Sequence, residues 1–199
     1  MKNGSVDEER KRELSKFRPS ELLTAFNTDL QDTVMAAMPT VDRCRDIPSP
    51  TLGELSELSP GGVDKVTGKT VKNIALVWLQ SQLLAVSLFC GVREKMSEWQ
   101  STAVCRQIVS QYPWLTMTEF VLFCARLRSQ CYGKFYGGID PSEIMGSLEK
   151  FISERQRDVW KRMEDEERAE QERRDEESSK NCITYEEYKR RKAAGMYDD

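Results

Sequence analysis

A short stretch of cationic and aromatic residues holds the side chains of this chain that are best suited to binding chemistry. Arg126 and Arg128 precede a loop that contains Lys134, Phe135 and Tyr136. Cationic side chains contact phosphate groups and aromatic rings stack on bases or on partner side chains, a combination typical of single-strand binding. These five residues are therefore our candidate contacts, either with a protein partner or directly with single-stranded or structured nucleic acid.

The loop that carries these residues, 132–141, also contains three glycines, Gly133, Gly137 and Gly138. Glycine allows left-handed backbone and close approach, so this composition suits a recognition loop. The composition equally suits a tight turn between two helices that requires left-handed backbone, in which the aromatic rings fold back onto the core. Asp140, followed by a proline, has the position of an N-cap for the next helix. Both interpretations stay open at this point.

The sequence lacks residues and motifs on which much common catalytic chemistry depends. There is no histidine among the 199 residues, which removes the commonest general base and the histidine ligands of zinc sites. Residues 62–70 end in Gly-Lys-Thr, but five residues instead of four separate Gly62 from Gly68, so a phosphate-binding loop is not expected. We predict no enzyme activity, no catalytic residue, no cofactor and no metal.

The overall charge and the cysteines indicate an intracellular protein. Thirty Lys and Arg residues against 33 Asp and Glu residues leave a net charge of -3, too little positive charge to recruit nucleic acid by itself. The six cysteines form no Cys-x-x-Cys pair and most lie among apolar residues, so we interpret them as buried thiols in a reducing compartment. The charged N-terminal segment has no signal-peptide pattern. We expect a cytoplasmic location.

Helical periodicity and caps predict an all-α fold, a single compact bundle of about five helices with a long charged C-terminal helix and a short terminal helix. Helices are expected over residues 19–38, 70–89, 97–112 and 116–128, and from residue 141 onward. The expected organisation is a flexible charged segment (1–18), a helical core domain (19–157), a charged helical extension (158–180) and a short C-terminal helix (181–199). A long connector, 39–69, contains at most a short helical turn at 52–58.

The helix expected at 70–89 is the most apolar of the set. No charged residue occurs between Asn73 and Val92, a length that approaches that of a membrane span. Gln80, Ser81, Gln82 and Ser87 interrupt it, and polar side chains are costly in lipid. We therefore interpret it as a central helix around which the others pack, with a membrane helix as the alternative, and we expect no membrane partner.

Nearly every residue from 161 to 177 is charged, with alternating signs. Glu164 with Arg168, and Glu170 with Arg174, have the i, i+4 spacing that supports an exposed helix. Too few apolar residues follow Met163 for a coiled coil. This stretch is interpreted as a solvated helical spacer.

Several motifs resemble an uncharacterised family of all-helical proteins from phages and integrative mobile elements of gut anaerobes. They are residues 50–52, the apolar helix expected at 70–89, residues 95–98, 112–116 and 119–126, the loop YGKFYGGID, and residues 144–155. Members carry a glycine and a basic residue where this chain has Gln130 and Cys131. The resemblance implies a phage or mobile-element setting, without an established activity.

From that setting and the helical architecture we expect a non-enzymatic accessory protein. Its expected role is a protein-interaction module that assists DNA replication, comparable to a helicase-loader adaptor, with a replicative helicase or another replication protein as partner. Direct nucleic-acid binding through residues 126–140 is the alternative, and the oligomeric state stays open.

Overall fold

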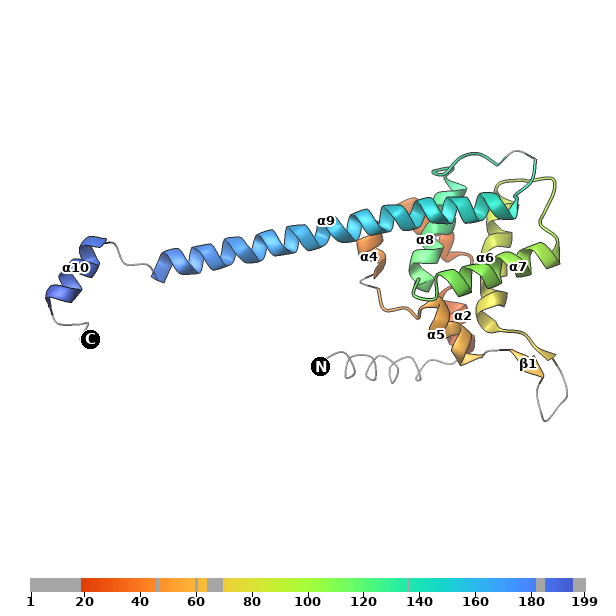
Figure 1. Cartoon of the computed structure of the whole chain (residues 1–199). Coiled ribbons are helices and arrows are strands. Elements are labelled where there is room, and N and C mark those ends of the chain that lie inside the picture. Colours follow the sequence, from red (N-terminus) through yellow and green to blue (C-terminus); the bar gives the residue numbers. More distant parts are fainter. Residues whose placement is uncertain are drawn as a thin grey trace. The chain divides into compact units, whose positions relative to one another are not determined.

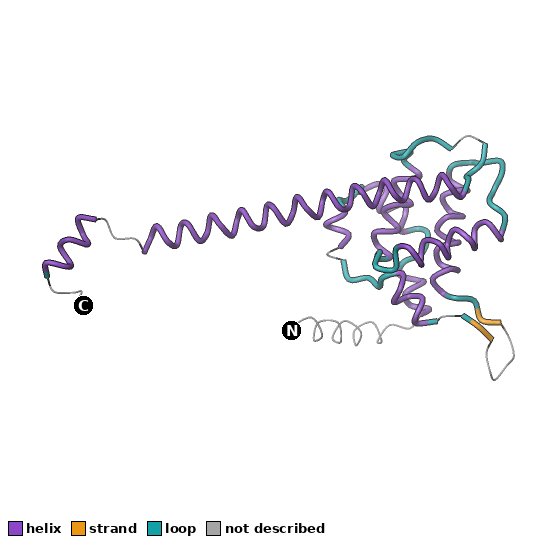
Figure 2. The backbone as a smooth tube through the Cα atoms, viewed as in Figure 1, coloured by secondary structure: helices purple, strands orange, loops and turns teal. Residues whose placement is uncertain are grey.

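The computed structural model describes residues 19–45, 47–59, 61–63, 70–135, 137–181 and 185–194. The regular secondary structure of this part of the chain is helical except for one pair of two-residue strands, which confirms the all-α class (Figures 1 and 2). The elements are α2 (Pro19–Ala25), α3 (Leu30–Ala37), α4 (Val41–Arg45), α5 (Leu52–Leu58), β1 (Gly62–Val63), β2 (Thr70–Val71), α6 (Ile74–Phe89), α7 (Glu98–Gln111), α8 (Met117–Arg128), α9 (Pro141–Asn181) and α10 (Tyr185–Ala193). The expected segment 1–18 lies outside the described residues.

The chain divides into two compact units between Arg155 and Gln156. The first unit holds α2 to α8 and the beginning of α9, and the second holds the rest of α9 and α10.

α8 is the most buried helix of the first unit. From the sequence, the helix at 70–89 was expected to hold this central position. Eleven of its twelve residues are buried, and α3, α4 and α6 all pack against it. The Phe120 and Phe123 rings lie with their centroids 5.6 Å apart, and Trp78 and Phe151 extend this aromatic cluster at 5.7 Å on either side. α6 is also in the core, but one of its faces is exposed.

Three helices begin with a capping box, in which a hydroxyl and an acid or amide side chain satisfy the free N–H groups of the first turn. Ser97 with Gln100 opens α7 and Thr116 with Glu119 opens α8, as the sequence predicted. Thr51 with Glu54 opens α5 in the same way. These local signals explain why α5, α7 and α8 begin close to the expected positions.

The helix expected over residues 19–38 is broken into α2 and α3. The Asn27 side-chain oxygen accepts hydrogen bonds from the backbone N–H groups of Asp29 (3.1 Å) and Leu30 (3.3 Å). Such an Asx turn competes with the helical hydrogen-bond pattern and interrupts the helix. The apolar stripe continues across this break, which is why periodicity alone missed it.

The connector between α3 and α6 is more ordered than the sequence indicated. α4 packs on α8, and the Leu52 N–H donates to the Leu115 carbonyl at 2.8 Å. Met117 N–H donates to the Pro50 carbonyl at 2.9 Å, so the connector is held against the turn between α7 and α8. β1 and β2 form an antiparallel pair, so β2 occupies the first residues of the helix expected over 70–89. α6 begins instead at Ile74, with Asn73 as its N-cap.

An uncharged polar network joins α3 to α6 inside the core. Gln31 donates to the Gln82 side-chain oxygen at 2.6 Å, and both residues are fully buried. The Phe26 carbonyl accepts from Gln82 Nε2 at 3.1 Å and from the Trp78 indole N–H at 2.7 Å. We call these four residues the amide network.

The second unit is held by local ion pairs. Arg174 lies 2.5 Å from Glu170 and Arg162 lies 2.8 Å from Glu166, both at i, i+4. The pair expected between Glu164 and Arg168 is replaced by a pair between Arg168 and Asp165. All side chains of residues 164–179 are exposed, as expected for a solvated helix.

Candidate functional site

Arg126, the first of the five predicted contact residues, lies half-buried near the end of α8. Its guanidinium donates to the Glu154 carboxylate at 2.7 Å and lies 5.6 Å from the centroid of the Phe151 ring. The Tyr132 hydroxyl donates to the same carboxylate at 2.9 Å, and burial is the main cause that raises the pKa of this phenol. Arg126 therefore helps to attach the beginning of the aromatic loop to α9.

Arg128 is more deeply buried than Arg126 and contacts more helices. Its side chain is buried, forms an ion pair with Asp32 of α3 and donates to the Gln31 side-chain oxygen at 3.4 Å. Its guanidinium also lies 4.1 Å from the centroid of the half-exposed Phe89 ring. Among the described residues Arg128 Nε has no hydrogen-bond partner. This arginine joins α8, α3 and the end of α6.

The remaining candidates differ from one another in their exposure to solvent. Lys134 is exposed, whereas Phe135 is half-buried and packs against the core. Tyr136 lies outside the described residues. The loop is thus neither fully buried nor a single exposed recognition surface.

Much of the loop's geometry is explained by turn formation. Gly137 has φ of 81°, and its carbonyl accepts hydrogen bonds from Arg93 and Glu94 at 3.0 and 3.1 Å. A Cβ on Gly138 would lie 3.2 Å from the Glu94 carbonyl oxygen, so the close approach favours glycine there. Asp140 caps α9 by accepting from the Ser142 N–H at 2.7 Å. The hydrogen bond from the Ser142 hydroxyl, together with the one from this N–H, lowers the pKa of Asp140.

The expected basic surface beside the loop is therefore not assembled as the sequence suggested. Arg126 and Arg128 have acid partners that lie 28 and 96 residues away in the sequence, Glu154 and Asp32. Sequence spacing carries no signal for such distant pairs. A binding role of the five residues stays a prediction, with Lys134 as the exposed cation among its described members.

A second buried ion pair attaches α9 to α8. Glu119 is fully buried; it accepts from the Thr116 N–H at 3.0 Å and from Arg155 Nε at 2.7 Å. The Arg155 guanidinium lies 4.5 Å from the centroid of the Trp114 ring. Because both oxygens of the carboxylate are occupied, this acid is a structural group.

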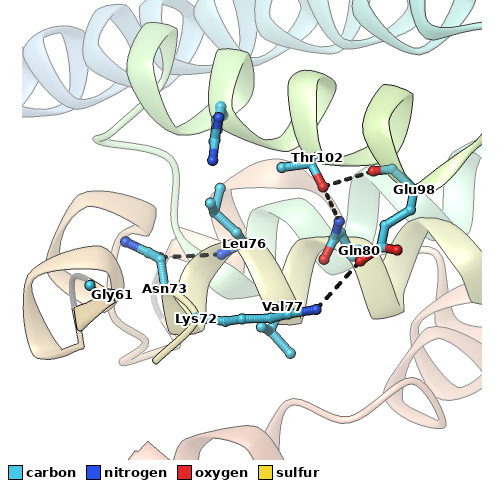
Figure 3. Close-up of a pocket in the computed structure, with 10 residues that line it drawn as sticks. Gly61, Lys72, Asn73, Leu76, Val77, Gln80, Glu98 and Thr102 are labelled. Atoms are coloured by element: carbon cyan, nitrogen blue, oxygen red, sulfur yellow. Dashed lines mark hydrogen bonds and ion pairs between the residues drawn. The ribbon is translucent and has the colours of Figure 1, made fainter. Parts of the chain in front are cut away.

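A surface groove of about 480 Å³ lies between the beginning of α6 and α7 (Figure 3). Gln80 donates to the Thr102 hydroxyl at 2.9 Å, and Lys72 lies 3.5 Å from Glu98. The groove is lined by Gly61, Gly62, Lys72, Asn73, Leu76, Val77, Gln80, Glu98, Thr102 and Arg106. Its polar groups bond mostly to one another, so it is suited to contact with another molecule more than to catalysis.

Beside this groove, α6 exposes apolar side chains that the sequence analysis assigned to the core. Val77, Leu84, Leu88 and Phe89 are all substantially exposed, although α6 contains no charged residue. None of the described helices is long and apolar enough to cross a membrane. The absence of charge was visible in the sequence, but the face that remains uncovered depends on how α5, α7 and α8 pack.

The cysteines behave mainly as buried apolar groups. Cys44, Cys105 and Cys124 are buried, which confirms the expectation for these three; Cys90 is partly buried, Cys131 is exposed and Cys182 lies outside the described residues. Burial raises the pKa of Cys44 to about 11 and that of Cys105 to about 12. Such thiols are poorly reactive. In the described part of the chain no group of three or more Cys, Asp or Glu side chains could hold a metal ion.

Comparisons of the sequence with known proteins show the family of this chain. No curated protein and no solved structure matches the chain. A family resemblance was expected over residues 50–157, whereas the matched range begins after α6 and includes α10. The sequence model of a family of unknown function, DUF6633, matches residues 95–195, more than half of the chain, and the protein therefore belongs to that family.

Proposed function

We propose that this protein is a non-enzymatic interaction module whose C-terminal arm binds a protein partner. The C-terminal arm is defined here as residues 156–181 of α9 together with α10. The observation that carries the proposal is exposure: all side chains of residues 164–179 and of residues 185–194 are exposed. None of these side chains is buried, so these parts of the arm contribute little to the stability of the fold.

The family match supports a role for the arm in binding another molecule. The matched residues, 95–195, include all of α10. α10 has nine residues, and a helix of that length without packing is marginal in water. Docking on a partner would supply the burial that stabilises it.

The chemistry of the arm fits a protein groove with an acidic rim. Tyr185 is 70% exposed, and four consecutive cations, 189–192, occupy the last turns of α10. The Lys189 ammonium lies 4.6 Å from the centroid of the Tyr185 ring. A helix that combines cations with aromatic anchors is a common form of helix-in-groove recognition. Near the beginning of the arm, Trp160 is 72% exposed and offers another anchor.

The resemblance to proteins of phages and integrative elements supplies the proposed setting. In that setting the module assists DNA replication as an adaptor similar to a helicase loader, and its partner is a replicative helicase or another replication protein. The helical core then presents the arm, and the chemistry of replication belongs to the partner.

The test uses the full chain as bait in a lysate of cells that carry the element. We expect a replication protein to be recovered by the wild type and lost with the double substitution Tyr185→Ala and Tyr188→Ala. Lys150→Ala is the matched control, because it changes an exposed side chain outside the arm and outside the five candidate contact residues. Recovery of no replication protein, or equal recovery by the double variant, would contradict the proposal.

Direct nucleic-acid binding is the second candidate, favoured by the exposed cations of α10 and by Lys134. Phosphate contacts release counterions, so affinity should fall steeply with salt. Gel shifts with single-stranded and hairpin oligonucleotides over a salt series test this. Replacing residues 189–192 with glutamine should flatten the salt dependence more than Lys134→Gln does. A wild-type chain that shifts neither probe at low salt excludes this function.

A further inference from the structure

α6 carries no charged side chain, yet one of its faces is open to solvent. Val77, Leu84, Leu88 and Phe89 are 39%, 49%, 58% and 51% exposed. A helix that is apolar on every side is ordinarily buried on every side, and contiguous exposed apolar patches mark interaction sites. The open face of α6 is therefore a candidate interaction surface.

The spacing on this face is that of a coiled-coil seam. Val77, Ser81, Leu84 and Leu88 are all exposed and follow one another at steps of four, three and four residues. Steps of three and four place side chains in one stripe that packs against a facing helix. We call these four residues the α6 seam.

The seam contains one polar group, which is already satisfied. The Ser81 hydroxyl donates to the Trp78 carbonyl of its own helix at 2.7 Å. It can therefore enter an apolar interface without leaving an unpaired donor. Its small side chain also allows a facing helix to approach closely near the middle of the seam.

The residues that flank the seam narrow the choice of occupant. Within α6, Gln80 and Ala85 on the two sides of the seam are uncharged, whereas helices that select a different partner use charges at flanking positions. The groove that Val77 lines carries charges of both signs, on Lys72, Arg106 and Glu98, so it favours neither an acidic nor a basic partner. Helices that lie on a membrane surface carry lysines and arginines, and α6 has neither. An identical uncharged seam is compatible with this surface without electrostatic repulsion.

We propose that the α6 seam packs antiparallel against the seam of a second copy of this chain. A two-fold axis between Ser81 and Leu84 places Val77 against Leu88 of the second copy and Ser81 against Leu84 of the second copy. Antiparallel packing also brings opposite ends of the two helix dipoles together. Such an interface is isologous, the usual form of a homodimer.

The size of the seam sets the strength of this dimer. The exposed apolar atoms of α6 cover on the order of a few hundred Å², in the range of functional surface patches. A stable interface buries about 800 Å² on each partner, so the seam and its rim give a weaker, reversible dimer. We expect dissociation in the micromolar range.

Sedimentation equilibrium of the full chain, from about 1 to about 200 micromolar, tests the proposal. The wild type should change from monomer to dimer across this range, and Leu84→Glu should weaken association at least tenfold. Met163→Glu is the matched control, because it places the same charge at an exposed apolar position of α9. Circular dichroism establishes that the variants are folded. A wild type that stays monomeric, or a Leu84→Glu variant that dimerises normally, overturns the proposal.

Disulfide cross-linking tests the antiparallel register without an added charge. In a background where Cys131 and Cys182 are serine, a mixture of Ser81→Cys and Leu84→Cys chains should form a mixed dimer faster than either chain alone. Ser81→Cys mixed with Val77→Cys is the control, because those positions lie about two turns out of register. Equal cross-linking in both mixtures, or Ser81→Cys linking mainly to itself, overturns the register. Flotation with phosphatidylcholine vesicles that Leu84→Glu abolishes would assign the face to lipid instead.

This inference does not depend on the proposed function. The seam lies on α6, whereas the partner test changes residues of α10, so the two proposals fail separately.

Discussion

The two parts of α9 show how one continuous helix can be stabilised in two different ways. In residues 141–155 an apolar stripe is buried, with Ile144, Leu148 and Phe151 nearly or fully inaccessible to solvent. In residues 164–179 every side chain is exposed, and the ion pairs are local. The first part is therefore held by tertiary packing and the second mainly by helix propensity and side-chain pairs, each of which contributes a few tenths of a kcal/mol.

The largest expected effect comes from removing a core side chain of the first part. Phe151→Ala should lower the free energy of unfolding by about 4 kcal/mol, because it empties a fully buried ring site. Met163→Ala, an exposed position on the same helix, should change it by less than about 0.5 kcal/mol. Urea denaturation of the full chain measures both. Similar losses in the two variants would show that the contrast between the two parts is wrong.

The next effect concerns the ion pair at the last residue of the first unit. Glu119→Ala removes the partner of Arg155 and an N-terminal capping interaction, and should destabilise the core by about 3 kcal/mol. Arg162→Ala, which removes an ion pair of the second unit with substantially exposed partners, should cost about 0.5 kcal/mol or less. Chemical denaturation monitored by tryptophan fluorescence distinguishes the two. A loss for Glu119→Ala no larger than that for Arg162→Ala would show that the buried pair does not hold α9.

A pH series tests the burial of the core independently of packing. Burial raises the pKa of Cys105 from 9.0 to about 12, so its contribution to stability is complete below pH 9 and is lost as the pH rises toward 12. Above pH 9 this thiol should lower the free energy of unfolding by about 1.4 kcal/mol per pH unit. Urea midpoints from pH 8 to 10.5 should fall less steeply in Cys105→Ala than in the wild type. Cys131→Ala, which removes an exposed thiol, is the control and should keep the wild-type slope.

The smallest effect belongs to the second part of α9. Glu170→Gln removes one pair with Arg174 and should lower helicity slightly, at a cost of about 0.3 kcal/mol. The urea midpoint of the core should not move, while far-ultraviolet circular dichroism should show a small loss of helix that high salt reproduces in the wild type. A shift of the core midpoint would mean that the two parts are energetically coupled.

Local signals account for the features of the fold that the sequence predicted correctly. The caps at Ser97, Thr116 and Asp140 depend on residues three or fewer positions away, and each begins or lies beside a helix as expected. Gly91 has a φ of 62° just after α6, the left-handed conformation that glycine commonly adopts after the end of a helix. The break at Asn27 was missed because apolar periodicity continues through it.

The site was harder to predict because it depends on distant contacts. The sequence shows two arginines before a loop, but whether they are available depends on Asp32 and Glu154, which other helices bring to them. Likewise, the uncharged stretch 73–92 indicates a buried helix, while its open face follows from three-dimensional packing. Composition identified the unusual segments, and tertiary structure decides which of them remain accessible.

The amide network between α3 and α6 has a consequence for how the chain avoids misfolding. If α3 shifted by one turn along α8, the helix against which it packs, many aliphatic contacts would survive, because leucine and valine side chains accept one another at several offsets. Gln31, Gln82 and the Phe26 carbonyl would then be buried without partners, at a cost that falls only on misaligned forms. The core thus rejects near-native alternatives through neutral amide groups, to which the Arg128 guanidinium adds a charged contact with Gln31.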